Sequence, residues 1–142
     1  NDDPYQKMMM QLLADRLAEA TAERGHEEVR RTLWGYAPDE HLTPDELFQE
    51  KYRGRRPAVG YPSLPDQSLN FLLDRVLDFA SLGVSLTEHG AMLPHASTCG
   101  LILAHPAARH FAVGPVSDEQ FLDYARRRGE SPDWLRKFLP MP

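Results

Sequence analysis

The first part of the chain shows a periodic pattern of apolar and polar residues. Between residues 5 and 17 an apolar residue recurs every three or four positions, with polar residues between. This spacing places the apolar side chains on one face and predicts a long amphipathic helix. Gly25 is expected to end or bend it. The apolar positions are Tyr5, Met8, Met9, Leu12, Leu13 and Leu17.

Capping residues and a second apolar stripe predict two more helices. Thr43, Pro44 and Glu46 supply an N-cap, a first-turn proline and the glutamate of a capping box. The short helix that follows should contain Leu47, Phe48 and Glu50. A third helix is predicted where one face carries Leu69, Leu72, Leu73, Val76 and Phe79. Gly83 stands where its left-handed C-terminal cap is expected.

The pattern changes in the last third of the chain. Residues 98–105 and 110–116 are short apolar runs separated by a proline-containing turn, which predicts two strands of an antiparallel pair. Capping signals predict two further helices, which begin after Ser117 and Ser131, and Gly129 should close the first of them. The chain is therefore expected to form a single α+β domain with an antiparallel sheet packed with several α-helices.

Composition excludes several classes of protein. Of 142 residues 42% are apolar and 26% charged, and no apolar run approaches the roughly 20 residues of a membrane-spanning helix. Cys99 is the single cysteine and no signal-peptide pattern opens the chain, so we expect a cytoplasmic protein. A net charge of -5 argues against nucleic-acid binding. The start at Asn1, without an initiator methionine, suggests a piece of a longer protein, although a processed terminus would look the same.

Residues 50–62 carry the most distinctive chemistry, because they combine arginine, proline, glycine and tyrosine. Prolines push Arg56 and Tyr61 toward extended backbone, and Gly60 permits a close approach. We expect a stiff ribbon with exposed amides. Guanidinium for a carboxylate, backbone for polar edges and a tyrosine ring beside a cation would suit a zwitterionic ligand. The alternative is a surface loop with solvated arginines.

Four blocks of sequence resemble one family. Residues 56–62 read Arg-Pro-Ala-Val-Gly-Tyr-Pro, which resembles the Arg-Pro-Ala-Pro-Gly-Tyr-Pro signature of the reactivation domain of cobalamin-dependent methionine synthase, with Val59 replacing one proline. Residues 14–20, 34–38 and 123–127 agree in order and approximate spacing. The similarity runs from about residue 3 to residue 139, and covers only the later part of the family's domain. It implies that residues 1–142 are the C-terminal part of such a domain.

In that family, S-adenosylmethionine (AdoMet) lies along the proline-rich ribbon. Carried over to matching positions, the resemblance implies that Arg56 pairs with the methionyl carboxylate. It also implies that backbone groups around Ala58 and Gly60, with the ring of Tyr61, hold the rest of the ligand. The earlier part of the family's domain, which contributes an acidic contact, has no counterpart among these blocks.

Four other positions complete the implied site. Glu19 and Glu50 match acidic positions that would offset the ammonium and sulfonium charges, although ordinary solvated glutamates are an equal alternative. Glu19 shares a helical stripe with Asp15, an orientation that would aim it inward. His110 and Phe111 fall where the family often has two aromatic residues, commonly tyrosines, and His110 departs from that pattern.

The resemblance also implies cofactors and partners. AdoMet would be the methyl donor that remethylates cobalamin after reduction of inactive cob(II)alamin, which supports methyl transfer from methyltetrahydrofolate to homocysteine in methionine biosynthesis. Cobalamin would be carried by the neighbouring cobalamin-binding domain, and a flavodoxin-like protein would donate the electron. Because the sulfonium is already activated, no catalytic nucleophile or base is implied, and the fragment alone should bind AdoMet without turnover.

Other interpretations compete with this one. Six histidines raise a metal site, but no two have the i, i+4 spacing of ligands on a helix, and only His105 and His110 could meet across the predicted hairpin. Cys99 lies in an apolar context that suits a buried residue better than a nucleophile. Residues 117–139 could form a DNA-binding helix-turn-helix, against which the acidity counts. The remaining alternative is an interaction module of the same fold that has lost AdoMet binding.

Overall fold

The computed structural model describes residues 3–139 and divides the chain into two compact units. The first unit comprises Asn1–Pro57 and Gly100–His110, and the second Ala58–Cys99 and Phe111–Pro142. Five α-helices and a small antiparallel sheet within the described residues confirm the predicted α+β class. No helix in residues 3–139 is both long and apolar enough to cross a membrane.

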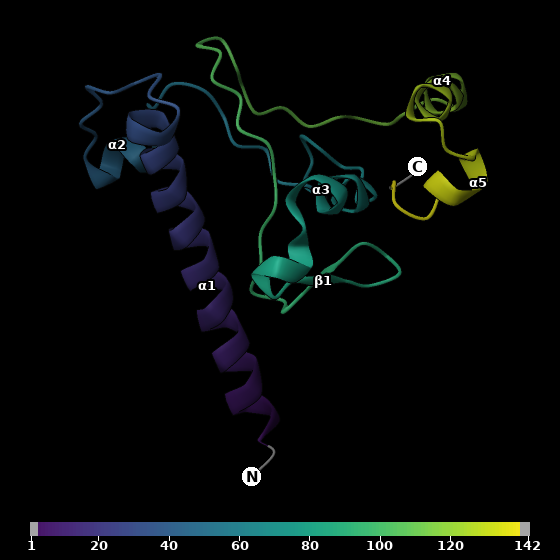
Figure 1. The fold of residues 1–142 in the computed structure, drawn as a ribbon, viewed down its shortest axis with the longest axis horizontal. Coiled ribbons are helices and arrows are strands. Elements are labelled where there is room, and N and C mark those ends of the chain that lie inside the picture. Colours follow the sequence, from purple (N-terminus) through teal and green to yellow (C-terminus); the bar gives the residue numbers. More distant parts are fainter. Residues whose placement is uncertain (1–2, 140–142) are drawn as a thin grey trace. The chain divides into compact units, whose positions relative to one another are not determined.

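The first unit begins with the long predicted helix. α1, Pro4–Glu28, has 25 residues and continues directly into a π-helical turn, η1, Val29–Leu33 (Figure 1). Asp3 caps it by accepting a hydrogen bond from the Tyr5 N–H at 3.0 Å. The expectation that Gly25 ends the helix is wrong, because Gly25 lies inside α1 and the hydrogen-bond ladder continues beyond it.

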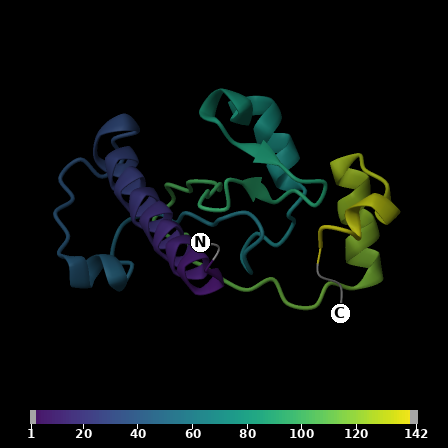
Figure 2. The same ribbon diagram turned by 90° about the horizontal axis from the view of Figure 1, so that it is seen from below.

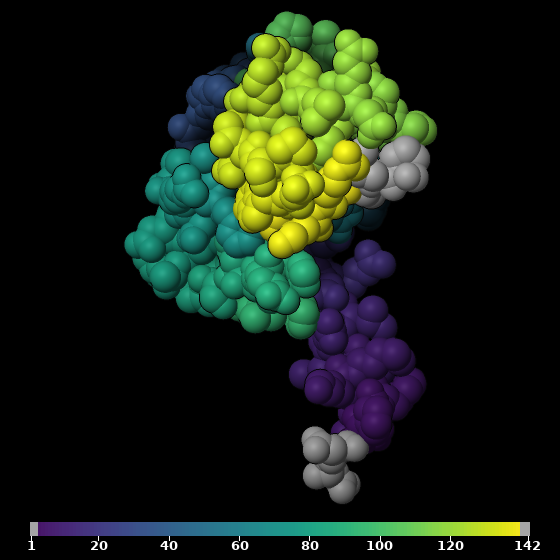
Figure 3. Space-filling view, turned by 90° about the vertical axis from the view of Figure 1, so that its right-hand side faces the viewer, coloured from purple at the N-terminus to yellow at the C-terminus, as the bar shows by residue number. Residues whose placement is uncertain are grey.

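The apolar stripe of α1 is exposed in this chain. Tyr5 is 65% exposed, Leu12 52% and Leu17 69%. Figure 3 shows the side chains of the first half of α1, in purple, open to solvent on the face in view. His26 is the residue of α1 that is buried. The C-terminal end of the helix therefore makes the packed contacts of this element within the described residues.

A short capped helix leads into the ribbon. α2, Pro44–Phe48, has the predicted capping box, in which Glu46 N–H donates to Thr43 Oγ1 at 3.3 Å and Thr43 N–H donates to Glu46 Oε2 at 3.0 Å. Glu50 was expected inside this helix, but it lies beyond the helix end with a positive φ of 52°. This left-handed backbone turns the chain into the ribbon.

The second unit contains the third predicted helix in a shorter form. α3, Leu69–Leu77, ends where Asp78 adopts a left-handed φ of 51°. The Asp74 carboxylate accepts a hydrogen bond from the Phe79 N–H at 2.9 Å and so favours this break. A 3-10 turn follows, η2, Phe79–Leu82. The predicted cap at Gly83 therefore closes η2 rather than α3.

The sheet consists of strands that the sequence pattern did not single out. β1, Ser85–Leu86, pairs antiparallel with β2, Met92–Leu93, in the register Ser85 to Leu93 and Leu86 to Met92. The predicted strand pair of residues 98–105 and 110–116 is wrong. Apolar alternation identified extended backbone but not its partner, because a strand's register and partner depend on distant residues.

The C-terminal helices have the predicted caps and form the core of the second unit. α4, Asp118–Arg128, begins after Ser117 and ends at Gly129, whose φ is 70°. α5, Pro132–Leu135, follows and lies against α4 (Figure 2). Their buried cluster consists of Phe121, Ala125 and Leu135, with Val116, Tyr124, Trp134 and Leu139 packed against it. Burial of this apolar area stabilises the helix pair.

Candidate functional site

The first half of the ribbon is hydrogen-bonded to residues 101–103, which belong to the same first unit. Arg55 and Leu103 form an antiparallel bridge, in which each N–H donates to the other residue's carbonyl at 2.9 Å. Leu101 N–H donates to the Pro57 carbonyl at 3.0 Å. Gly54 has a φ of +83°, and a Cβ there would collide with the Leu103 carbonyl oxygen. Only glycine therefore allows the ribbon to approach this segment so closely.

The ring of Tyr52, a residue of the ribbon, lies close to two guanidinium groups. Tyr52 is 8% exposed, and its ring centroid lies 4.5 Å from the Arg30 Cζ and 5.5 Å from the Arg55 Cζ. The His26 ring packs edge-on against it, with 5.2 Å between centroids. Such contacts let a tyrosine ring hold guanidinium groups close together despite their like charges.

Arg30 has its own buried partner. The side chain comes from η1 and is fully buried, and its Nε and Nη2 both donate to the Glu40 carboxylate, at 2.6 Å for Nη2 and 2.8 Å for Nε to Oε1. A second contact joins Nε to Oε2 at 3.0 Å. Glu40 thus takes one whole edge of this guanidinium, which is the geometry expected of a buried arginine.

His26 remains neutral at neutral pH. The residue is 1% exposed, and its Nε2 lies 3.3 Å from the Tyr36 hydroxyl. Its pKa is lowered to about 4, chiefly by burial, and the positive charges of Arg30, Arg56 and Arg55 add to this. An uncharged imidazole can therefore lie among the arginines without further repulsion.

Arg56 points to a carboxylate that the sequence analysis did not select. Its Nη2 donates to Glu23 Oε1 at 2.6 Å. The Arg56 Nε is buried and has no hydrogen-bond partner among the described residues. Glu23 follows Glu19 by four residues on α1, so helical spacing places both on one face and was the available signal.

The other predicted residues of the first unit differ in position. Glu50 lies 3.3 Å from Arg55 Nε and 3.9 Å from His110 Nε2, so the structure brings these three side chains together. Glu19 is exposed on α1, and the expected inward orientation is wrong. The apolar stripe it follows is itself uncovered, which removes the reason for Glu19 to turn inward.

The ribbon's second half turns back on itself within the second unit. Val59 N–H donates to the Cys99 carbonyl at 3.0 Å, and Gly60 N–H to the Leu64 carbonyl at 2.9 Å. Leu64 N–H returns a bond to the Tyr61 carbonyl at 2.8 Å. The expectation of exposed amides is therefore wrong at Val59 and Gly60. The φ of +86° at Gly60 produces the turn that satisfies them.

Two aromatic rings of the second unit are open to solvent. Tyr61 is 57% exposed and Phe111 65%. Their backbone segments are joined, because Phe111 N–H donates to Ser63 Oγ at 3.3 Å and Val113 N–H donates to the Pro62 carbonyl at 2.9 Å. The two rings therefore belong to neighbouring stretches of backbone.

Comparison with known proteins identifies the family. The sequence model of the family described as vitamin B12 dependent methionine synthase, activation domain, matches residues 1–129. The chain belongs to this family. A solved structure of the MetH reactivation domain bound to AdoHcy is similar at 43% sequence identity with a TM-score of 0.88, over 99% of this chain and 45% of that chain. The chain thus spans less than half the length of that relative.

One of the sequence blocks of this activation-domain chain has a structural role. In residues 123–127 the Tyr124 hydroxyl donates to Asp66 Oδ2 at 2.5 Å. Arg128, next to the block, lies 3.6 Å from the same carboxylate and donates to Ser68 Oγ at 3.0 Å. Burial, and then Asp66, raise the pKa of the Tyr124 phenol. This network ties α4 to the loop before α3.

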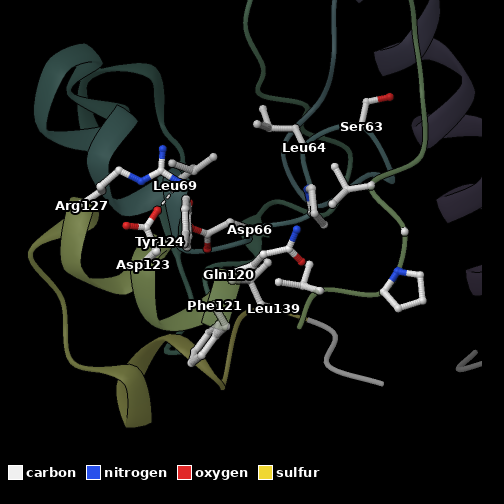
Figure 4. A pocket seen from close by; sticks show the side chains of 15 residues that line it. Ser63, Leu64, Asp66, Leu69, Gln120, Phe121, Asp123, Tyr124, Arg127 and Leu139 are labelled. Atoms are coloured by element: carbon white, nitrogen blue, oxygen red, sulfur yellow. Dashed lines mark hydrogen bonds and ion pairs between the residues drawn. The ribbon is translucent and has the colours of Figure 1, made fainter. Parts of the chain in front are cut away.

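A pocket of about 480 Å³ lies wholly in the second unit. Its lining is largely apolar and includes Leu64, Leu69, Phe121 and Leu139. Figure 4 shows the charged side chains there, of which Asp123 and Arg127 form an ion pair of 2.8 Å, while Asp66 accepts from the Tyr124 hydroxyl. No residue of the predicted AdoMet site lines it. Paired polar groups leave little to recognise a charged ligand, so this pocket is a poor candidate for the site.

The alternatives based on metal or thiol chemistry gain no support. Within residues 3–139, no group of three or more His, Cys, Asp and Glu side chains is arranged to hold a metal ion. His105 Nδ1 accepts a hydrogen bond from the Ala107 N–H at 3.1 Å, and His110 faces Glu50. Cys99 is half-buried. The polar chemistry of the candidate site in this activation-domain chain rests on arginines and carboxylates.

Proposed function

We propose that this chain binds AdoMet and presents it as the methyl donor for reductive remethylation of cobalamin in cobalamin-dependent methionine synthase. The observation that carries the proposal is the 43% identity, over 99% of the chain, to a reactivation domain bound to AdoHcy. AdoHcy is AdoMet without the transferable methyl group, so a site that fits one fits most of the other.

Arg56 is the proposed anchor for the methionyl carboxylate. Its side chain is 22% exposed and its Nη2 is held by Glu23 at 2.6 Å, so the guanidinium is fixed in position. The buried Nε without an acceptor fits a ligand oxygen, because a buried donor is costly to leave unpaired. An arginine can bind a carboxylate through two parallel hydrogen bonds.

Carboxylates of the first unit are proposed to offset the positive charges of the ligand. AdoMet carries an ammonium and a sulfonium group besides its carboxylate. Glu50 is 44% exposed and already faces the side chains of Arg55 and His110. Glu19 is exposed on α1 and available to an ammonium group. Partial exposure implies that each carboxylate adds a modest, salt-dependent attraction.

The second unit is proposed to hold the remaining parts of the ligand through backbone and aromatic groups. The Ala58 carbonyl accepts only a long hydrogen bond, 3.4 Å from the Tyr61 N–H, and so retains capacity for a second donor. Gly60 has no side chain of its own and is exposed, although the Gln67 side chain lies against its α-carbon. The exposed rings of Tyr61 and Phe111 offer faces to a heterocycle or a cation.

The chemistry proposed for the protein is orientation of the methyl donor. Cobalamin, carried by the neighbouring cobalamin-binding domain, would supply the methyl acceptor, and a flavodoxin-like protein in the cytoplasm would supply the electron. The sulfonium methyl is already activated, so fixing its position shortens the search for a reactive geometry, which contributes strongly in such transfers. The fragment alone is expected to bind without turnover.

Calorimetric titration of AdoMet into the 142-residue chain tests the proposal. We expect saturable binding, at least about tenfold weaker in Arg56→Ala, because a hydrogen bond to a charged group contributes roughly 1.5–3 kcal/mol. Arg126→Ala is the matched control: its side chain is 80% exposed on α4 and pairs with Asp123, so affinity should not change. ATP should not compete.

The outcomes separate the two functions considered. AdoMet binding that is at least about tenfold weaker in Arg56→Ala and unchanged in Arg126→Ala supports the AdoMet site. A folded chain that does not bind AdoMet would support an interaction module that has lost the ligand. Circular dichroism of each variant establishes that it is folded.

A further inference from the structure

We infer that Glu23 is an internal competitor for the ligand carboxylate on Arg56. The inference rests on the proposed function and adds a residue that lowers the apparent affinity for AdoMet. The Glu23 carboxylate lies 2.6 Å from Arg56 Nη2, so it occupies a donor that the methionyl carboxylate would use.

The edge of Arg56 that Glu23 contacts is only half used. Nε and Nη2 form one edge of a guanidinium, and a carboxylate can bind both in parallel. Glu23 contacts Nη2, while Nε is buried and lacks an acceptor among residues 3–139. A carboxylate aligned with the whole edge would satisfy both donors and displace Glu23.

Arg30 shows what a filled edge looks like in the same unit. Glu40 contacts both Nε and Nη2 of Arg30, with the arginine side chain fully buried and Glu40 at 9% exposure. Glu23 is 51% exposed and contacts one donor. The first pair is a fixed structural contact, whereas the second is open to exchange with an incoming carboxylate.

The size of the competition follows from this exposure. A solvent-exposed ion pair changes an equilibrium by no more than about fivefold. Glu23→Gln keeps the shape of the side chain and removes its charge, so it should tighten binding of carboxylate-bearing ligands by up to about fivefold.

Three ligands distinguish competition from general electrostatics. AdoHcy carries one carboxylate and one ammonium and is neutral overall, so loss of a distant negative charge hardly changes its attraction to the protein. AdoMet has one additional positive charge. 5′-Methylthioadenosine keeps the nucleoside and the thioether but lacks the amino acid, and competition at Arg56 cannot affect it.

The experiment is calorimetric titration of wild type, Glu23→Gln and a control with AdoHcy, AdoMet and 5′-methylthioadenosine. The control is Glu27→Gln, because Glu27 lies one turn further along α1 and forms similar ion pairs, with Arg24 at 2.7 Å and Arg31 at 2.9 Å. We expect Glu23→Gln to bind AdoHcy and AdoMet more tightly, with 5′-methylthioadenosine unchanged and Glu27→Gln like wild type.

Each outcome decides the inference. Tighter AdoHcy binding confined to Glu23→Gln supports it. Unchanged or weaker AdoHcy binding in Glu23→Gln, with wild type binding normally, overturns it and leaves the proposed function intact. Absence of AdoMet and AdoHcy binding in both proteins overturns the proposed function and the inference together.

Discussion

Two charged networks in this chain use the same residue types for different ends. In the second unit the Asp66 carboxylate accepts from the Ser68 N–H at 2.8 Å and from the Tyr124 hydroxyl, while the Arg128 Nε, itself buried without a hydrogen-bond acceptor among the described residues, lies 3.6 Å away. In the first unit Arg56 has one contact to an exposed glutamate and a buried Nε without an acceptor. Both oxygens of Asp66 are hydrogen-bonded from within the unit, whereas the edge of Arg56 that faces Glu23 keeps one donor without an acceptor in the described part of the chain.

The difference shows how a structural contact can be separated from a binding contact. Buried polar groups are normally satisfied, because an unpaired one costs a large part of its desolvation energy. A carboxylate with both oxygens paired, such as that of Asp66, fixes the positions of its elements. A half-filled edge such as that of Arg56 leaves that energy to be gained from a ligand.

The largest expected effect tests the network of Asp66. Asp66→Asn removes the charge that faces Arg128 and one acceptor of the Tyr124 hydroxyl, at a residue only 3% exposed. Breaking a buried pair in this way costs roughly 3 kcal/mol of unfolding free energy. Urea unfolding followed by circular dichroism measures it.

Asp123→Asn is the control for this change. Asp123 also lies on α4 but pairs with Arg126 and Arg127 at the surface, where water screens ion pairs and leaves them weak. If both variants lost the same small amount, Asp66 would be a peripheral contact and the contrast between the networks would fail.

The next effect tests the environment of Arg56 through His26. In the unfolded chain this imidazole binds a proton below its ordinary pKa of 6.5, whereas in the folded chain it does so only below about 4. The folded state therefore binds fewer protons between these values, and stability falls as the pH is lowered from 6.5 to 4. The loss from this group is roughly 2 kcal/mol between pH 7 and pH 4.5.

His26→Gln should remove this part of the pH dependence. The glutamine amide does not titrate, so the difference in unfolding free energy between pH 7 and pH 4.5 should be roughly 2 kcal/mol smaller than in wild type. His89→Gln is the control, since it replaces an imidazole whose side chain is 71% exposed rather than buried. An equal pH dependence in His26→Gln and wild type would contradict the neutral, buried imidazole.

Local rules allowed much of the helical structure to be predicted. Capping boxes at Thr43 and Ser117 and the left-handed glycine at Gly129 are short-range features, and all three are confirmed. The strands were predicted wrongly because pairing is long-range. Leu103, in the predicted strand of residues 98–105, pairs with Arg55 of the ribbon, which lies 48 positions earlier in the chain. The apolar periodicity of neither segment indicates that the two segments pair.

Residues of the candidate site could be predicted only where the sequence resembles that of the family. Residue matching selected Arg56 and Glu50, but their surroundings depend on tertiary packing. Burial of Arg30 on a π-helical turn and the pairing of Glu23 with Arg56 follow from how α1 meets the ribbon. Sequence spacing offered Glu23 as a neighbour of Glu19 without indicating that it would reach the arginine.

The smallest expected effect tests whether the hydrogen bonds around the turn at Gly60 are as firmly held as those of the Asp66 carboxylate. Gly60 and Gly83 are both exposed and have φ of 86° and 72°, so alanine strains the backbone at each. At Gly60 the added Cβ would also collide with the side-chain amide of Gln67, which donates to the Gly90 carbonyl at 2.9 Å; at Gly83 nothing lies within 4 Å. Displacing that hydrogen bond should make Gly60→Ala about 1 kcal/mol more destabilising than Gly83→Ala in urea unfolding. Equal losses of unfolding free energy in the two variants would mean that the turn accommodates a side chain at residue 60. Its backbone amides would then be held less firmly than the hydrogen bonds around Gly60 indicate.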